Sequence, residues 1–154
     1  ISLGKNIPYD KAEKEARTAI KNGSAWNVFL NMVQQQGGDI SYMEHPDKFP
    51  CADVILEYKA KESGYITYMD TEGFGIAAGI LGAGRSKKED EIDISAGIIQ
   101  QAKINDAVKK GDTIAILYTS DQRSANAAAK KLDTCYQISD QKVKDVTLIG
   151  AIVR

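Results

Sequence analysis

The sequence predicts an α+β protein in which two helices precede a β-rich unit. Apolar residues recur at helical spacing over residues 10–36, and from residue 53 they alternate with polar residues as in a half-buried strand. With 154 residues and a hydrophobic fraction of 43%, the chain can form the core of one ordinary domain, or of one and a half small ones.

The first predicted helix begins at Asp10 and ends at Asn22 and Gly23. Asp10 and Glu13 have the spacing of a capping box, in which the Asp side chain accepts a terminal N–H and the Glu side chain reaches back. Gly23 can adopt the left-handed conformation that ends a helix. The apolar positions of this helix are Ala12, Ala16, Ala19 and Ile20.

A second predicted helix begins at Ser24, which we expect to cap it, and ends at Gly37 and Gly38. Its apolar stripe consists of Trp26, Phe29, Met32 and Val33. Two short amphipathic helices cannot bury such faces on each other alone, so we expect them to form the edge of a larger helical layer. An isolated chain should therefore self-associate, or leave residues 1–40 disordered.

Residues 40–50 are expected to be an irregular linker, because Pro46 and Pro50 favour extended backbone. The β-rich unit follows. We expect Gly82 or Gly84 to have a positive φ, where a brief helix turns sharply into a strand. The predicted strands are residues 53–60, 65–69, 91–99, 113–119 and 146–153, the predicted helices are residues 75–81 and 124–136, and residues 107–112 form a turn.

The charge balance excludes some classes of partner. Lys plus Arg number 20 and Asp plus Glu number 21, so the net charge of −1 gives no field for nucleic acid or for acidic membranes. No apolar run has membrane length, and residues 1–8 lack the features of a signal peptide. We expect a cytoplasmic protein. The chain begins at Ile1 without a methionine, which suits an excised or proteolysed fragment as well as a trimmed protein.

Few residues suggest catalysis or metal binding. His45, the single histidine, has no cysteine or serine motif to activate, and we interpret it as a solvated loop residue. Cys51 and Cys135 have no metal-ligand spacing, and we expect two reduced, half-buried thiols. An acidic cluster, which consists of Glu89, Asp90, Glu91 and Asp93, could hold a hard cation. We expect instead that Glu91 and Asp93 lie on one solvated strand face and that two neighbouring lysines neutralise the cluster.

The glycine-rich segment from Gly82 through Ala83 and Gly84 to Arg85 leaves two interpretations open. Glycines let backbone N–H groups approach an anion that an arginine could clamp, but the P-loop and dinucleotide motifs are both absent. The structural interpretation is that the glycines permit a sharp turn, with Arg85 bonded to carbonyls or to a neighbouring acid. We favour the structural interpretation.

One long segment and three short ones resemble a known family. Residues 79–97, with the sequence GILGAGRSKKEDEIDISAG, are similar to a segment in the C-terminal part of pyrimidine-nucleoside phosphorylases and thymidine phosphorylases. Three shorter matches occur in the same order, at residues 36–39 (QGGD), 64–66 (GYI) and 109–112 (KKGD). The resemblance spans residues 10–152.

The resemblance implies a parent enzyme that cleaves uridine or thymidine with phosphate, giving the free base and ribose- or deoxyribose-1-phosphate. Residues 1–50 would be the C-terminal helices of its α/β catalytic domain plus a linker, and residues 51–154 an α/β-hammerhead, barrel-sandwich-like domain. The family's phosphate- and base-binding residues lie upstream of the matched part. The resemblance therefore gives this chain no catalytic, cofactor-binding or metal-binding residue, and implies that the isolated chain is inactive. It also implies a homodimeric parent, with phosphate as a co-substrate.

Two observations qualify this resemblance. Relatives usually have Val-Gly-Asp where this chain has Ile104-Asn105-Asp106, and we expect Asn105 to preserve the turn because asparagine tolerates left-handed backbone. The turn from Lys109 to Asp112 also resembles that of biotinyl and lipoyl carrier domains. The alternative is thus a stand-alone binding or carrier module, although such a module has no use for the two helices at residues 10–36.

Overall fold

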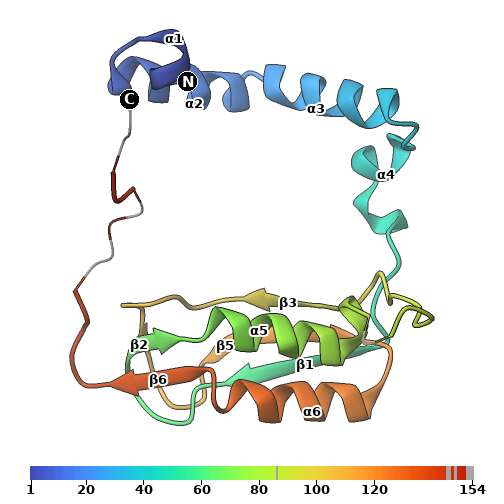
Figure 1. Cartoon of the computed structure of the whole chain (residues 1–154), viewed down its shortest axis with the longest axis vertical. Helices are drawn as coiled ribbons and strands as arrows, with labels where there is room; N and C mark the ends of the chain where they lie inside the picture. The colour runs from blue at the N-terminus through green and yellow to red at the C-terminus, as the bar shows by residue number, and fades with distance from the viewer. Residues whose placement is uncertain (86, 145–146, 148, 152–154) are drawn as a thin grey trace. The chain divides into compact units, whose positions relative to one another are not determined.

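The computed structural model describes residues 1–85, 87–144, 147 and 149–151. Its internal contacts divide the chain into two units, Ile1–Phe49 and Pro50–Arg154. The first unit is helical, and every strand of the described residues lies in the second (Figure 1). The predicted α+β class is confirmed. Within the part of the chain that the structure describes, no helix combines the length and the apolar character needed to span a membrane.

The helical unit contains the two predicted long helices, α2 (Tyr9–Lys21) and α3 (Ser24–Gln35). Gly23 and Gly37 follow them with φ of 79° each, as expected for glycines that end helices. The remaining elements are single helical turns: α1 (Ser2–Lys5), α4 (Ser41–Glu44) and the 3-10 turn η1 (Pro46–Lys48). The segment expected to be an irregular linker is therefore partly helical.

Both predicted N-caps are wrong. α2 begins one residue before Asp10, after Pro8, and no side chain caps it. Glu13 instead accepts hydrogen bonds from the Arg17 guanidinium at 2.9 and 2.7 Å, which is the favoured pairing one turn along a helix. Ser24 is the first residue of α3 and not its cap, because Gly23 occupies the cap position and joins the two helices directly.

The second unit contains two open antiparallel sheets of three strands each. Sheet A has the order β1-β5-β3, with β1 (Val54–Lys59), β5 (Thr113–Thr119) and β3 (Gly97–Gln100). Sheet B has the order β4-β2-β6, with β4 (Ala107–Val108), β2 (Gly64–Met69) and β6 (Tyr136–Ser139). In sheet A, Leu56 of β1 lies opposite Leu117 of β5, and Leu117 is fully buried.

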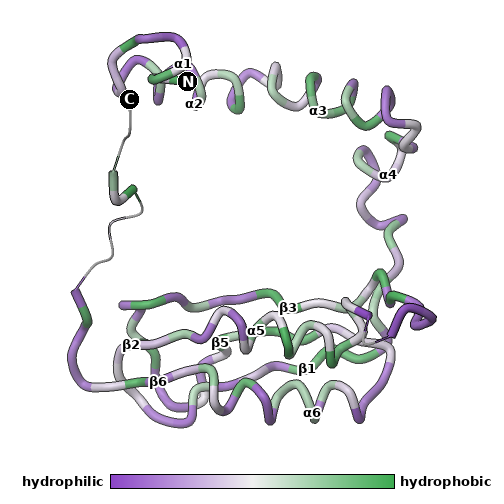
Figure 2. The backbone as a smooth tube through the Cα atoms, in the orientation of Figure 1, coloured by the Kyte–Doolittle hydropathy of each residue, from purple (hydrophilic) through white to green (hydrophobic). Residues whose placement is uncertain are grey.

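Two helices complete the core of this unit. α5 (Thr71–Ala78) packs against α6 (Gln122–Leu132), and α6 also packs on β1 and β5. Small and large apolar residues face the core at helical spacing in α6, where Ala125, Ala128 and Leu132 are fully buried. Figure 2 shows how hydrophobic and hydrophilic residues are interleaved along α6. Asp121 caps α6 by accepting a hydrogen bond from the Ser124 N–H at 2.8 Å.

Several predicted boundaries in this unit differ from the structure. The helix predicted at residues 75–81 begins at Thr71 and continues into a π-helical turn, η2 (Gly79–Ala83). The helix predicted at residues 124–136 ends at Leu132, and a strand that was not predicted, β6, follows it. The strand predicted at residues 91–99 is reduced to β3. Half of the strand predicted at residues 146–153 lies outside the described residues, and the structure assigns no strand to the other half, residues 147 and 149–151.

Candidate functional site

Gly82 lies within η2 but has a non-helical backbone, with φ of 108° and ψ of −1°, whereas Gly84, which follows η2, is extended with φ of −144°. The prediction of a positive φ at this turn is thus confirmed for Gly82. A side chain at Gly82 would be strained by the backbone conformation, and its Cβ would lie 3.1 Å from Asp93 Cβ. The glycine therefore permits both the reversal of the chain and the close approach of Asp93.

Asp93 joins this turn to two other segments. Its N–H donates to the Gly82 carbonyl at 3.0 Å. Its carboxylate accepts hydrogen bonds from the Ser95 N–H at 2.9 Å, the Ser95 hydroxyl at 2.6 Å and the Ser120 N–H at 3.2 Å. The Ser95 hydrogen bonds hold the pKa of Asp93 below its ordinary value. The expectation that Asp93 lines a solvated strand face is wrong, because these donors fold residues 93–96 into a turn.

A buried hydroxyl binds the other end of the same turn. Thr119 at the end of β5 is 1% exposed, and its Oγ1 donates to the Leu81 carbonyl at 2.7 Å. Arg85 is exposed, and no hydrogen bond or ion pair joins it to any other described residue. The structural role expected of Arg85 thus falls to Thr119, which binds Leu81, and to Asp93, which binds Gly82.

A Lys-x-x-Asp turn occurs three times among the described residues of the β-rich unit. In each, the lysine N–H donates to the aspartate Oδ2 at 2.8 Å, in the pairs Lys87 and Asp90, Lys103 and Asp106, and Lys109 and Asp112. The aspartate N–H returns a hydrogen bond to the lysine carbonyl in every case. The sequence analysis did not predict these turns, although the spacing of Lys and Asp is visible in the sequence.

The second of these turns pairs with β2, and the third pairs with the segment that joins β1 to β2. The third residues of the turns, Asn105 and Gly111, have φ of 71° and 95°. Ala60 exchanges two backbone hydrogen bonds with residues 111 and 112, and Ile66 exchanges two with residues 105 and 106. The expectation that Asn105 preserves the turn in left-handed conformation is confirmed.

Three polar side chains meet where the β1–β2 loop faces the end of α6. The Tyr58 hydroxyl donates to Asp133 Oδ1 at 2.9 Å, and Lys61 Nζ lies 2.7 Å from the same oxygen. The Lys61 ammonium holds the pKa of Asp133 below its ordinary value, while burial raises the pKa of Tyr58. A cavity of about 140 Å³ adjoins this cluster. The cluster joins loop to helix and leaves no group poised as a nucleophile or general base.

The remaining candidates lie apart from one another. His45 is exposed between α4 and η1. Glu89 and Glu91 are exposed, and no set of three His, Cys, Asp or Glu side chains in the described part of the chain gathers as metal ligands. The two cysteines are not both half-buried as expected: Cys51 is exposed and Cys135 is buried, and neither forms a disulfide within the described residues.

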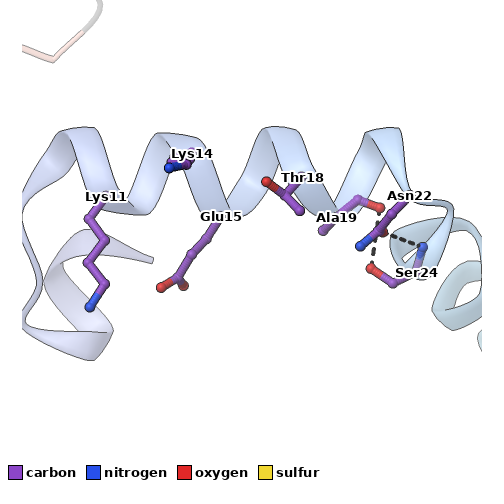
Figure 3. Close-up of a pocket in the computed structure, with 7 residues that line it drawn as sticks. All are labelled: Lys11, Lys14, Glu15, Thr18, Ala19, Asn22 and Ser24. Atoms are coloured by element: carbon purple, nitrogen blue, oxygen red, sulfur yellow. Dashed lines mark hydrogen bonds between the residues drawn. The ribbon is translucent and has the colours of Figure 1, made fainter.

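A shallow depression of about 500 Å³ runs along α2 in the helical unit. Its lining is a mixture of charged and small polar side chains from α2 and from the start of α3, which Figure 3 shows along the helix. Glu15, one of the lining residues, pairs with Lys5 at 3.0 Å. Opposite charges that neutralise each other on an open helix face favour solvent contact over binding of a specific ligand.

Comparison with known proteins shows which family the β-rich unit resembles. Residues 65–139 match the family described as pyrimidine nucleoside phosphorylase C-terminal domain. The β-rich unit is therefore similar to the C-terminal domain of this family. The resemblance seen in the sequence is thereby confirmed.

Curated relatives extend the match beyond that domain. The pyrimidine-nucleoside phosphorylases of Staphylococcus aureus strains USA300 and NCTC 8325 / PS 47 are each 39% identical over 150 residues, which is 94% of this chain. The chain spans only 34% of the length of these relatives. The C-terminal domain and the helices before it thus correspond to about a third of a longer enzyme.

Proposed function

We propose that this sequence is the C-terminal part of an enzyme that splits pyrimidine nucleosides with inorganic phosphate. The observation that carries the proposal is the 39% identity to pyrimidine-nucleoside phosphorylases over 94% of the chain. In this reaction a phosphate oxygen bonds to the anomeric carbon of the sugar while the bond to the base nitrogen breaks. The electron pair leaves with the base, so the products are uracil or thymine and ribose- or deoxyribose-1-phosphate.

Within that enzyme the chain has a structural role. Phosphorolysis needs cations and hydrogen-bond donors positioned around the phosphate and the base. In the β-rich unit, the polar side chains around Asp93 and those around Asp133 bind backbone groups or side chains of their own cluster. Helices α2 and α3 favour this proposal over a stand-alone carrier module, which has no use for them. We further propose that the whole enzyme is a cytoplasmic homodimer.

The test compares the 154-residue chain with a whole enzyme that contains it. A suitable whole enzyme is the Staphylococcus aureus phosphorylase with its matched C-terminal region replaced by this chain. Chromatography would measure the release of uracil from uridine and of thymine from thymidine, with and without phosphate. We expect phosphate-dependent release by the chimera alone. An inactive, folded chimera would contradict the proposed activity, and release by the isolated chain would contradict its structural role.

A further inference from the structure

The junction between α2 and α3 contains an asparagine followed directly by a glycine. Asn22 is exposed at the C-terminal end of α2, and Gly23 has left-handed backbone with φ of 79°. This is the single Asn-Gly pair in the sequence. Asparagine is among the chemically labile residues of proteins. A glycine that follows it has no Cβ, so its backbone nitrogen is the least hindered and the most mobile that an asparagine side chain can meet.

We propose that Asn22 is a self-modification site, at which the Gly23 backbone nitrogen attacks the Asn22 side-chain amide. The Gly23 nitrogen gives up its proton and bonds to Cγ of Asn22, and the bond from Cγ to Nδ2 breaks, so that ammonia leaves. The product is a succinimide ring. Water then opens this ring at either carbonyl, which gives aspartate or isoaspartate. The net reaction consumes water and releases ammonia, so it requires no enzyme, cofactor or oxidant.

The folded junction holds the two reacting groups apart. Asn22 has ψ of 0°, whereas ring closure requires the Gly23 nitrogen to nearly eclipse Cβ, so ψ must rotate by roughly 120°, out of the helical region. That rotation breaks the hydrogen bond from the Gly23 N–H to the Ile20 carbonyl at 3.3 Å. The Asn22 Oδ1 is also bound, because it accepts from the Ser24 N–H at 3.0 Å (Figure 3). The reaction therefore proceeds from an open junction.

Little else in the helical unit keeps this junction closed. All of residues 1–49 are described, and Ala12 is the one residue among them that is buried. The Ser24 hydroxyl donates to the Ala19 carbonyl at 3.3 Å, but this hydrogen bond is exposed to water. Segments with few buried apolar contacts and exposed backbone hydrogen bonds open locally at a low cost in free energy. The junction therefore opens often enough for the Gly23 nitrogen to reach the Asn22 side chain.

The two products differ in their effect on the junction. In isoaspartate the main chain runs through Cβ, so the connection to Gly23 is longer by a carbon atom and the hydrogen bonds that end α2 lose their geometry. Aspartate keeps an oxygen that can accept from the Ser24 N–H. Its charge is favoured at the N-terminal end of α3 and disfavoured at the C-terminal end of α2, so the two dipole effects oppose each other. We therefore expect isoaspartate, and not aspartate, to disrupt the junction.

The experiment ages the 154-residue chain at mildly alkaline pH, which favours loss of the proton from the attacking nitrogen. Ion exchange separates chains that have gained a carboxylate, and peptide mass spectrometry locates the change. An isoaspartate methyltransferase detects isoaspartate by its free α-carboxylate. Asn27 and Asn31 are internal controls, because both are exposed in the same unit but are followed by residues with bulky side chains. We expect Asn22 to deamidate at least about tenfold faster than either control.

A variant shows whether the acidic species comes from Asn22. Asn22→Gln keeps an amide, but its longer side chain would close a six-membered ring, which forms far more slowly. We expect the acidic species and the isoaspartate signal to disappear in this variant. Equal rates at Asn22 and at the two controls, or the same acidic species in Asn22→Gln, would overturn the proposal.

Concentrated urea tests whether the folded junction delays the reaction. We expect Asn22 to deamidate at least about threefold faster in urea than in buffer, because urea removes the hydrogen bonds that hold its ψ near the helical value. Asn27 and Asn31 should remain slow in both solutions, since their bulky neighbours are unchanged. Equal rates for Asn22 in urea and in buffer would overturn the protective role of the junction.

Discussion

The side-chain amide of Asn105 binds both backbone groups of Val143. Its Nδ2 donates to the Val143 carbonyl and its Oδ1 accepts from the Val143 N–H, each at 2.9 Å. Asn105 also has the left-handed backbone that its turn requires, with φ of 71°. A glycine here would supply the backbone conformation but not the two hydrogen bonds. The asparagine therefore adds to the turn an anchor for the segment that follows β6.

Substitution at Asn105 separates these two contributions. Asn105→Gly should cost about 1 kcal/mol of unfolding free energy, because it removes the hydrogen bonds and keeps a relaxed turn. Asn105→Ala should cost more, about 2 kcal/mol, since alanine also strains the left-handed backbone. Urea denaturation measures both values, and hydrogen exchange at the Val143 amide reports the anchor. Unchanged exchange at Val143 in either variant would show that the amide pair does not hold this segment.

Two stacked tyrosines in the core should respond oppositely to loss of their hydroxyls. The Tyr58 and Tyr136 ring centroids lie 5.9 Å apart. Tyr58 donates to Asp133, whereas the buried Tyr136 hydroxyl has no hydrogen-bond partner in the described part of the chain. Tyr58→Phe should lower the unfolding free energy by about 1 kcal/mol, and Tyr136→Phe should leave it unchanged or raise it by up to about 1 kcal/mol. Each variant is the other's control, and a clear loss in Tyr136→Phe would contradict an unpaired hydroxyl.

The hydrogen bond from Thr119 to the Leu81 carbonyl should contribute measurably to stability. Thr119→Val keeps the shape of the side chain but leaves a buried carbonyl without its donor, and should cost about 1–3 kcal/mol. Thr119→Ser keeps the hydroxyl and is the matched control, with the loss of one methyl group only. Chemical denaturation of the two variants gives the comparison. If Thr119→Ser were as destabilising as Thr119→Val, packing and not the hydrogen bond would be the cause.

The sequence predicted those elements whose local signals agree. β1 alternates clearly, β5 is a short apolar run after the turn at Gly111, α2 and α3 have helical spacing and glycine ends, and the turn at Gly82 has the residue that a positive φ needs. The misses occur where two signals compete. Alternation from Glu91 to Ile99 favours a strand, but Asp93 accepts the Ser95 N–H and forms a turn instead.

The end of α6 was missed for a related reason. The alanine-rich pattern runs past Leu132, and nothing local shows that Cys135 enters the core or that Tyr136 pairs with Met69 of β2. Those contacts are long-range, so the periodicity of the sequence does not reveal them.

For function, the sequence indicated the family through its pattern of glycines, arginine and acids, because a family is recognised from the whole pattern. It could not show that Trp26, Phe29 and Met32 of α3 are exposed, because exposure depends on which other residues cover them.

Asp93 should make the stability of the β-rich unit depend on pH in the acid range. Its pKa in the folded state lies below the ordinary value of 3.8, mainly because the Ser95 hydroxyl and N–H donate to the charged carboxylate. The group therefore adds stability that is fully present above its unfolded pKa and is lost as pH falls through the lower folded pKa. Other carboxylates with lowered pKa values, such as Asp133, contribute to the same loss of stability at acid pH, which we call the acid limb.

Asp93→Asn should make the acid limb less steep below about pH 4 than in the wild-type chain. Glu91→Gln changes an exposed neighbour and should leave the acid limb unchanged. Denaturation midpoints between about pH 2 and pH 6 give the comparison. An acid limb of the same slope in Asp93→Asn as in the wild type would show that the hydrogen bonds to Asp93 do not distinguish its charged form from its neutral one.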